Sequence, residues 1–388
     1  MYRSLSRSAV IATTPRALAD YFADLPDPRV ALKCDHEFLD ILLIVVVATI
    51  GGADDFVSVA AFARAKEPWF RARLGLQLPN GVPSHDTLNR VFAIIAPGPF
   101  QTCFGAFVAS MSDRLKLKQV PIDGKAMRGS KRKTLAGHRT AHMVSAWAAE
   151  NGVTLAQVRT DEKSNEITAI PELLALLDVS GALVSIDAMG CQKDIAAQIV
   201  TQKGDYLLAV KENQPRLFED LQRLADEALE RGYAGLSTDL QEGNGHGRQE
   251  MRFCFVIENL ESVRDRALWP KLRALVGIVS SRVVRGQVSD EVRYYIRSRK
   301  ASAKVFQRGV RAHWSIENTC HWVLDVAFRE DDHRLREGHA PENMSLVRKM
   351  ALAMLKKATA NMGIKNKRLR AGWDEAFLEH VLRDFLGE

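Results

Sequence analysis

Apolar residues recur at helical spacing through the first third of the chain. The spacing predicts an all-helical domain over residues 19–116, in which turn signals rich in Pro, Gly and Asn separate the helices. The predicted helices are 19–23, 35–51, 55–74, 84–95 and 100–115. Ser84 follows a proline and is placed to cap the fourth of them. Residues 1–18 lack this periodicity and are expected to form a loose leader.

From residue 118 onward the period changes to that of strands. The order is three strands followed by alternating helices and strands, with the segments at 119–124, 142–149, 153–160, 167–177, 182–187, 192–201, 206–210 and 215–229. That order is the signature of a ribonuclease H-like domain. The predicted fold class is therefore α/β: a ribonuclease H-like mixed sheet flanked by helices, preceded by the all-helical N-terminal domain.

The second half of the chain interrupts this core. Glycine-rich sequence and three β-rich runs, at 248–258, 275–284 and 292–299, predict a β-rich insertion. The expected boundaries are a catalytic core at 117–230 and 301–360, the insertion at 231–300 and a basic C-terminal tail at 361–388. The lysines and arginines of this tail are either a solvated surface or a phosphate-binding strip.

One predicted helix carries a carboxylate in its apolar stripe. At about 100° per residue, the run 302–330 places on one face Phe306, Val310, Trp314, His321, Leu324 and Phe328. Glu317 lies in the middle of this face, where burying an unpaired carboxylate would cost several kcal/mol. It therefore needs an arginine, a proton or a metal ion as partner.

Composition narrows the class of protein. The 388 residues include 54 Lys and Arg against 47 Asp and Glu, a net charge of +7 that favours a polyanionic partner without proving one. Five scattered cysteines, none in a zinc-type pair, fit a reducing cytoplasm. The most apolar run, 38–50, is too short to span a bilayer and no secretory signal is evident, so we expect a cytoplasmic protein without membrane association.

Two aspartates stand at predicted strand ends. Asp123 ends the first strand and Asp187 the fourth. If these strands are parallel neighbours, about 4.8 Å apart, both carboxylates emerge at the same edge of the sheet and repel each other unless a cation neutralises them. The alternative for each aspartate alone is a turn cap.

A third carboxylate would complete a metal site. Oxygen ligands favour Mg²⁺ or Mn²⁺, and Glu317 brought in by a packed helix would complete a site for two ions suited to phosphodiester chemistry. His313 and His321 share the helix face with Glu317 and raise a zinc alternative, but the adjacent His-Glu pair of the common zinc motif is absent from the sequence.

Several blocks of sequence together resemble a known family. They are Ser84-His85-Asp86-Thr87, Ile122-Asp123-Gly124-Lys125 with Arg128-Gly129-Ser130, Ser185-Ile186-Asp187-Ala188, His313-Trp314 with Ile316-Glu317-Asn318, His321-Trp322 with Leu324-Asp325-Val326, and Glu330-Asp331-Asp332 with Arg334. The chain resembles the DDE transposases of bacterial insertion sequences, in the branch that includes the H-repeat-associated proteins. The resemblance covers nearly the whole chain.

The resemblance implies a catalytic and metal-binding triad of Asp123, Asp187 and Glu317 with Mg²⁺ or Mn²⁺, two ions in all. It also implies transposon ends and target DNA as partners, a homodimer in the DNA complex and a place at the bacterial nucleoid. Candidate DNA contacts are Lys125, Arg128, Lys131, Arg132, Lys211, His246, Arg248, Arg308, Arg311, His313 and Arg329.

At positions near Glu317, the chain differs from the wider group of transposases to which this branch belongs. Where that group has a tyrosine, an arginine and a lysine, this chain has Val310, His313 and Leu324, which leaves Arg308, Arg311 and Arg329 as candidates to supply the positive charge. Two other functions stay open: a domesticated or inactive DNA-binding protein, and a related metal-dependent nuclease without strand transfer.

Overall fold

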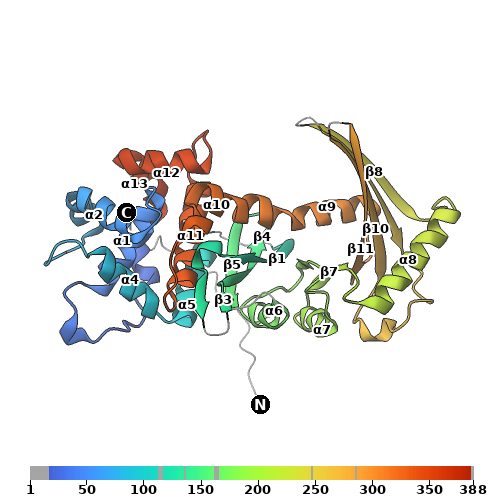
Figure 1. Ribbon diagram of the computed structural model, residues 1–388, viewed down its shortest axis with the longest axis horizontal. Coiled ribbons are helices and arrows are strands. Elements are labelled where there is room, and N and C mark those ends of the chain that lie inside the picture. Colours follow the sequence, from blue (N-terminus) through green and yellow to red (C-terminus); the bar gives the residue numbers. More distant parts are fainter. Residues whose placement is uncertain are drawn as a thin grey trace, which may run out of the picture. The chain divides into compact units, whose positions relative to one another are not determined.

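The computed structural model describes residues 17–111, 117–134, 137–160, 166–245, 248–284 and 286–385. The chain divides into two compact units, one formed by residues 1–113 and 338–388 and the other by residues 114–337 (Figure 1). The first unit therefore joins sequence from both ends of the chain.

The first unit is helical. Its α-helices are α1 (Phe38–Ile50), α2 (Phe56–Ala65), α3 (Glu67–Leu74), α4 (His85–Ile94), α5 (Pro97–Ser110), α11 (Ala340–Lys357), α12 (Ile364–Trp373) and α13 (Glu375–Leu382). Helix α1 is buried at almost every position and packs against α11. A helix that is apolar on every face must be buried on every face. Helix α11, from the far end of the chain, provides part of this burial.

Two local predictions for this unit can be compared with the structure. Ser84 caps α4 as expected, since its side chain accepts a hydrogen bond from the amide of Thr87. The predicted helix over 55–74 is wrong in one respect, because it breaks at Lys66 into α2 and α3. Pro68 stands in the first turn of α3, where its missing N–H costs nothing.

The basic C-terminal segment folds into helices α12 and α13. Lys367 donates to the carbonyls of Leu355 and Ala358 at the end of α11, at 2.9 and 2.7 Å. Arg368 donates to the carbonyls of Thr49 and Ala53 and pairs with Asp54. Both cations are buried at helix C-termini, where the partial charge is negative. These two residues are therefore neither solvated surface nor phosphate ligands.

The second unit is built on a nine-stranded sheet with the order β5-β4-β1-β6-β7-β11-β10-β9-β8. The strands are β1 (Gln119–Ala126), β4 (His142–Ala148), β5 (Val153–Thr160), β6 (Leu183–Ile186), β7 (Asp205–Val210), β8 (Ser237–Gly245), β9 (Arg248–Ile257), β10 (Ala274–Val284) and β11 (Gln287–Arg297). β1 pairs in parallel with β6, and β6 with β7, which confirms the predicted neighbours.

The insertion extends this sheet. β11 pairs antiparallel with β7, so the four strands β8 to β11 continue the same hydrogen-bonded ladder. Strand β8 was not predicted, because its polar, glycine-containing sequence lacks apolar alternation. Pairing with β9 along its whole length supplies what local sequence does not.

Helices cover both faces of the sheet (Figure 1). Helix α9 (Ala303–His313) packs along one face against β1, β6, β8, β9 and β10. Helices α6 (Glu166–Ala175) and α7 (Lys193–Thr201) lie on the other face of the first strands, against β4, β5 and β7. After β1, a short two-stranded sheet is formed by β2 (Arg132–Thr134) and β3 (Gly137–Arg139).

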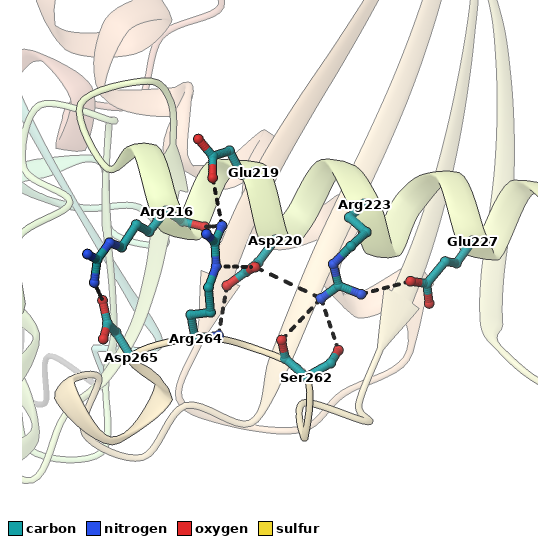
Figure 2. Close-up of polar contacts among 8 residues, drawn as sticks. All are labelled: Arg216, Glu219, Asp220, Arg223, Glu227, Ser262, Arg264 and Asp265. Atoms are coloured by element: carbon teal, nitrogen blue, oxygen red, sulfur yellow. Dashed lines mark hydrogen bonds and ion pairs between the residues drawn. The ribbon is translucent and has the colours of Figure 1, made fainter.

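Helix α8 (Pro215–Glu230) is tied to the loop between β9 and β10 (Figure 2). Buried Asp220 accepts hydrogen bonds from the backbone amide of Arg264 at 2.8 Å and from its Nε at 2.9 Å. Arg223 reaches the carbonyl and hydroxyl oxygens of Ser262, both at 3.1 Å. The loop is thus held to the helix by one buried carboxylate and an outer ring of exposed charges.

No single helix in the described residues is long and apolar enough to cross a membrane. Helices α4 and α5 pass such a test only as a pair, and they are bent by 96° at the break between them.

Replacing Asp220 with Ala should destabilise the second unit, because the partly buried amide and the Nε of Arg264 lose their acceptor. We expect the Tm to fall by at least about 2–4 °C in a thermal unfolding measurement. The matched control is Glu219→Ala, one residue earlier on the same helix, whose exposed carboxylate also pairs with Arg264. A fall as large in the control would show that surface charge, and not the buried hydrogen bonds, holds the loop.

Candidate active site

The three predicted carboxylates line one pocket. Asp123 lies on β1, Asp187 directly follows β6, and Glu317 stands in the helical segment after α9. Because β1 and β6 are parallel, both aspartates lie at the same edge of the sheet. Three segments distant in sequence therefore bring their acidic groups to one place.

Asp123 is held by a buried histidine. The Nδ1 atom of His321 lies 3.3 Å from a carboxylate oxygen of Asp123, and the His321 side chain is 8% exposed. Burial raises the pKa of Asp123, but the hydrogen bond and charge of His321, together with the charge of His313, outweigh it and hold the pKa below its ordinary value. Asp123 is therefore ionised at neutral pH.

The surroundings of Asp187 favour its ionised form less than those of Asp123 do. Burial raises its pKa, and the negative charges of Asp123 and Glu166 raise it further, against the opposing hydrogen bond from the amide of Gly190. Its Oδ1 accepts from the amides of Met189 and Gly190 at 3.1 and 3.3 Å. The aspartate thus caps a turn, as the alternative interpretation proposed, and also faces a second carboxylate.

His313 stands beside both aspartates. Its Nδ1 lies 3.1 Å from the hydroxyl oxygen of Ser185 on β6. Burial lowers the pKa of His313, and the nearby charges of Asp123 and Asp187 do not fully offset this. The contact with the Ser185 hydroxyl therefore fixes the orientation of the imidazole beside the two carboxylates.

In the described part of the chain, no three His, Cys, Asp or Glu side chains are grouped closely enough to hold a metal ion. This applies both to the zinc alternative with His313 and His321 and to the three carboxylates as they stand. Asp123 and Asp187 influence each other's charge, but Glu317 is exposed on the pocket wall.

The predicted helix over 302–330 is not continuous. Helix α9 ends at His313, a π turn spans Glu317–His321, and α10 (Trp322–Phe328) completes the segment. Most of the predicted stripe is buried, including Phe306, Leu324 and Phe328.

The prediction that the whole stripe is buried is wrong at two positions. Trp314 and Glu317 are both exposed. The π turn holds more residues than a regular α-helical turn, which rotates the buried face of the helix. Ile316 and Cys320 therefore enter the core where Trp314 and Glu317 were expected. The carboxylate therefore needs no buried partner, and faces the pocket.

Lys125 occupies a place that the sequence did not predict. Its Nζ lies 2.6 Å from Asp325, 2.9 Å from Glu330 and 3.3 Å from Asp331, and its side chain is 10% exposed. Burial lowers the pKa of Lys125, but the charges of Glu330 and Asp325 raise it above its ordinary value. A cation enclosed by three carboxylates does not present its charge to DNA, which corrects its assignment as a DNA contact.

The other candidate DNA contacts are dispersed. Arg128, Lys131 and Arg132 are exposed after β1, Arg308 and Arg311 are exposed on α9, and Lys211 lines the pocket. Arg329 is exposed and pairs with Asp332 at 3.1 Å. His246 lies outside the described residues, and Arg248 begins β9, with its side chain outside the described part.

A second hollow adjoins the pocket and was not found from the sequence. Four arginines line it, and we call it the arginine hollow: Arg252, Arg282, Arg293 and Arg311. It shares Arg293 and Trp314 with the pocket, and the Arg293 guanidinium lies 4.9 Å from the Trp314 ring centre. The available signal was the alternation Glu250-x-Arg252 and Glu291-x-Arg293, which places both charges on one strand face.

Comparisons with known proteins identify the family of this chain. A family model described as Transposase DDE domain matches residues 115–354, and one described as DDE_Tnp_1-associated matches residues 19–108. The chain belongs to the DDE transposase family. Its relatives include "Putative transposase YncI" of Escherichia coli O157:H7, with 40% identity over 95% of this chain and 94% of that protein.

A second relative of this DDE family member is "H repeat-associated putative transposase YhhI" of Escherichia coli strain K12. It is 36% identical over 95% of this chain and 98% of that protein. Among solved structures, a piggyBac transposase synaptic complex with hairpin DNA covers 94% of this chain and 76% of that chain, with a TM-score of 0.43 and 8% identity.

The first block that resembles the DDE family, Ile122-Asp123-Gly124-Lys125, has a physical explanation in the fold. Asp123 and Lys125 face the α9–α10 side of the sheet, while Gly124 faces α6. A side chain at Gly124 would collide with the buried pair of His142 and Glu166. This pair was missed from the sequence because its members lie on separate elements, β4 and α6.

Replacing Gly124 with Ala should destabilise the protein by about 1–3 kcal/mol, because the added methyl group must displace His142 or Glu166. The control is Gly243→Ala on β8, where an added Cβ meets nothing within 4 Å. Urea unfolding of both variants measures the difference. Equal midpoints would show that the buried pair yields without cost.

Proposed function

We propose that this protein is a transposase that cuts DNA at the ends of its own element and joins the freed 3′-hydroxyl to target DNA. Asp123, Asp187 and Glu317 are the proposed catalytic triad. The observation that carries the proposal is that these three carboxylates, from three separate segments, line one pocket at the edge of a parallel strand pair. Membership of the DDE transposase family supports the same reaction class.

The fold of the catalytic unit is inferred to be ribonuclease H-like. The first five strands lie in the order β5-β4-β1-β6-β7, with β1, β6 and β7 parallel and β4 and β5 antiparallel to their neighbours. This arrangement supports the inference, as does the position of the β-rich insertion, between β7 and the segment that carries Glu317.

The aspartate pair fits a divalent cation. The pKa of Asp187 is raised by burial and by the charge of Asp123, so a cation between them would relieve the repulsion. Hard oxygen ligands select Mg²⁺ or Mn²⁺, and two such ions activate the attacking hydroxyl and stabilise the leaving oxygen in phosphoryl transfer. Because Glu317 is not grouped with the aspartates, the proposed triad requires it to come closer when metal and DNA bind.

Each protein group then has a definite task. Asp123, kept ionised, and Asp187 would hold the cations at the sheet edge. His321 fixes the orientation of Asp123 through Nδ1, and Ser185 with His313 closes the pocket behind the aspartates. The backbone amides of Met189 and Gly190 orient Asp187 so that its second oxygen remains for a ligand.

DNA is the proposed partner, and the transposon ends and target are expected to be held by a homodimer. The arginine hollow, continuous with the pocket through Arg293 and Trp314, is the proposed path of a strand leaving the active site. Exposed Arg128, Lys131 and Arg132 would contact phosphates on the other side of Asp123.

Replacing Asp123 or Asp187 with Asn, or Glu317 with Gln, should lower Mg²⁺-dependent cleavage at least about 100-fold, since loss of an outer-shell partner of a metal already costs about 10–100-fold. The substrate is labelled DNA from the regions flanking the reading frame, and pre-cleaved ends test joining. The control is Asp194→Asn at an exposed position on α7. Unchanged cleavage in the three variants would reject the triad, and cleavage without joined product would indicate a nuclease.

Replacing Arg311 with Ala should weaken DNA binding about equally for all sequences and reduce the slope of log K against log salt by about 1. Fluorescence anisotropy at several salt concentrations gives both values. The control is Arg216→Ala on α8, an exposed arginine that lines neither the pocket nor the arginine hollow. Equal slopes for the two variants would mean that the hollow makes no particular contact.

A further inference from the structure

Strand β1 presents alternate residues to the helical segment that carries Glu317. Gln119 donates to the carbonyl of Gly309 at 2.7 Å, Asp123 contacts His321 at 3.3 Å, and Lys125 contacts Asp325 at 2.6 Å. These odd-numbered positions share one face of the strand. The whole helical segment is therefore attached to the strand that bears the first catalytic aspartate.

The contacts of Asp123 with His321 and of Lys125 with Asp325 have matching spacings on the strand and on the helical segment. Residues two apart on a strand are separated by about 6.6 Å, from a rise of about 3.3 Å per residue. Residues four apart on a helix are separated by about 6.0 Å, from a rise of about 1.5 Å per residue. Asp123 and Lys125 on β1 can therefore engage His321, at the end of the π turn, and Asp325 on α10 simultaneously.

The end of the segment is fixed to the same lysine. Helix α10 ends at Phe328, and the left-handed backbone of the following residue, Arg329, with φ of 51°, turns the chain back toward β1. The next residues, Glu330 and Asp331, complete the set of carboxylates around Lys125 Nζ. Asp331 also accepts a hydrogen bond from the amide of Arg128 at 3.3 Å.

Close backbone approach confirms that these segments are tightly joined. A side chain at Gly129 would collide with the backbone of His333 and Asp331. Only glycine permits the loop after β1 to pack so closely against residues 330–333. Lys125 lies between this junction and the contact of His321 with Asp123.

The centre of this group is buried. Glu330 is 2% exposed and Lys125 10%, while Asp325 and Asp331 at the margin are 33% and 26% exposed. Without Lys125, the three carboxylates would lose the cation that they share, and their mutual repulsion would favour separation or protonation. Loss of the cation should therefore release α10 from β1.

Glu317 depends on this attachment because of the π turn. The turn begins at Glu317 and ends at His321, the residue that contacts Asp123. A single π turn is an interruption of the regular helix and is often found at functional sites. The position of Glu317 is thus set from beyond the turn, by the attachment of α10.

We infer that Lys125 is a positioning residue: together with Asp325 it holds α10 in register on β1 and so sets the distance of Glu317 from Asp123. This inference rests on the proposed triad. It replaces DNA contact as the role of Lys125.

The test compares Lys125→Met with Lys131→Met, an exposed lysine of the adjoining loop that is a candidate phosphate contact. Lys125→Met should lower Mg²⁺-dependent cleavage by about 10- to 100-fold through misplacement of Glu317, with DNA affinity and its salt slope unchanged. Lys131→Met should weaken binding and reduce the salt slope by about 1. A reduced salt slope in Lys125→Met, or full cleavage activity, overturns the inference.

Hydrogen exchange provides a readout that does not depend on catalysis. In Lys125→Met and in Asp325→Asn, the amides of residues 317–332 should exchange at least about tenfold faster than in the wild type, while those of α7 do not change. If the wild type cleaves no DNA, the proposed function fails, and this measurement still decides the role of Lys125. Unchanged exchange rates would overturn it.

A double variant separates positioning from general stability. Lys125→Met with Glu330→Gln also removes the buried negative charge that Lys125 contacts, so the Tm should recover toward that of the wild type. Cleavage should remain low, because Asp325 on α10 still lacks its partner on β1. Recovery of both Tm and cleavage would assign Lys125 a purely structural role and reject the inference.

Discussion

Repulsion between Asp123 and Asp187 is the constraint on which the catalytic unit depends. Parallel pairing of β1 with β6 brings the two carboxylates to one sheet edge. The pKa values of the two aspartates shift in opposite directions. His321 and His313 hold the pKa of Asp123 below its ordinary value, whereas burial and the charge of Asp123 raise the pKa of Asp187. One carboxylate of the pair is therefore ionised, and the other is held by backbone amides.

The helical segment from α9 to α10 supports this pair and adapts to it. Its apolar side chains, among them Phe306 and Leu324, anchor it on the sheet, and its polar side chains lie where β1 carries complementary groups. The interruption at Glu317–His321 allows one segment to bury His321 beside Asp123 while leaving Glu317 in the pocket wall. A regular helix would place Glu317 in the core instead.

The β-rich insertion enlarges the same surface. Because β11 pairs with β7, the arginines of β9, β10 and β11 lie on one continuous sheet that also ends at the pocket. Their partners Glu250 and Glu291 hold them in place, and the pKa of each glutamate is lowered once these hydrogen bonds and charges outweigh burial. Positive charge that is dispersed in the sequence is thereby concentrated beside the active site.

Most elements of the second unit followed from local sequence. The apolar runs of β1, β6 and β7 and the turn signals between them predicted the strands. The prediction that Asp123 ends its strand is wrong, because β1 continues to Ala126, but the parallel pairing of β1 with β6 ends at Ile122 and Ile186, one residue before each aspartate, so the predicted shared edge holds. The missing parts had no local signal. Strand β8 is polar and exists only through pairing with β9, and helices α12 and α13 lie in a segment whose charge suggested a tail.

The sequence by itself determined the chemistry available: three carboxylates, their order, and the elements that carry them. Tertiary structure decided which charges are exposed. Lys125 at the end of β1 and Arg128 just after it belong to the same basic stretch of sequence, yet Lys125 is enclosed by three acidic side chains and Arg128 is 84% exposed. The physical reason is that a charge's role depends on its solvation and on partners from distant segments, here residues 325–331, and neither is encoded in the neighbouring residues.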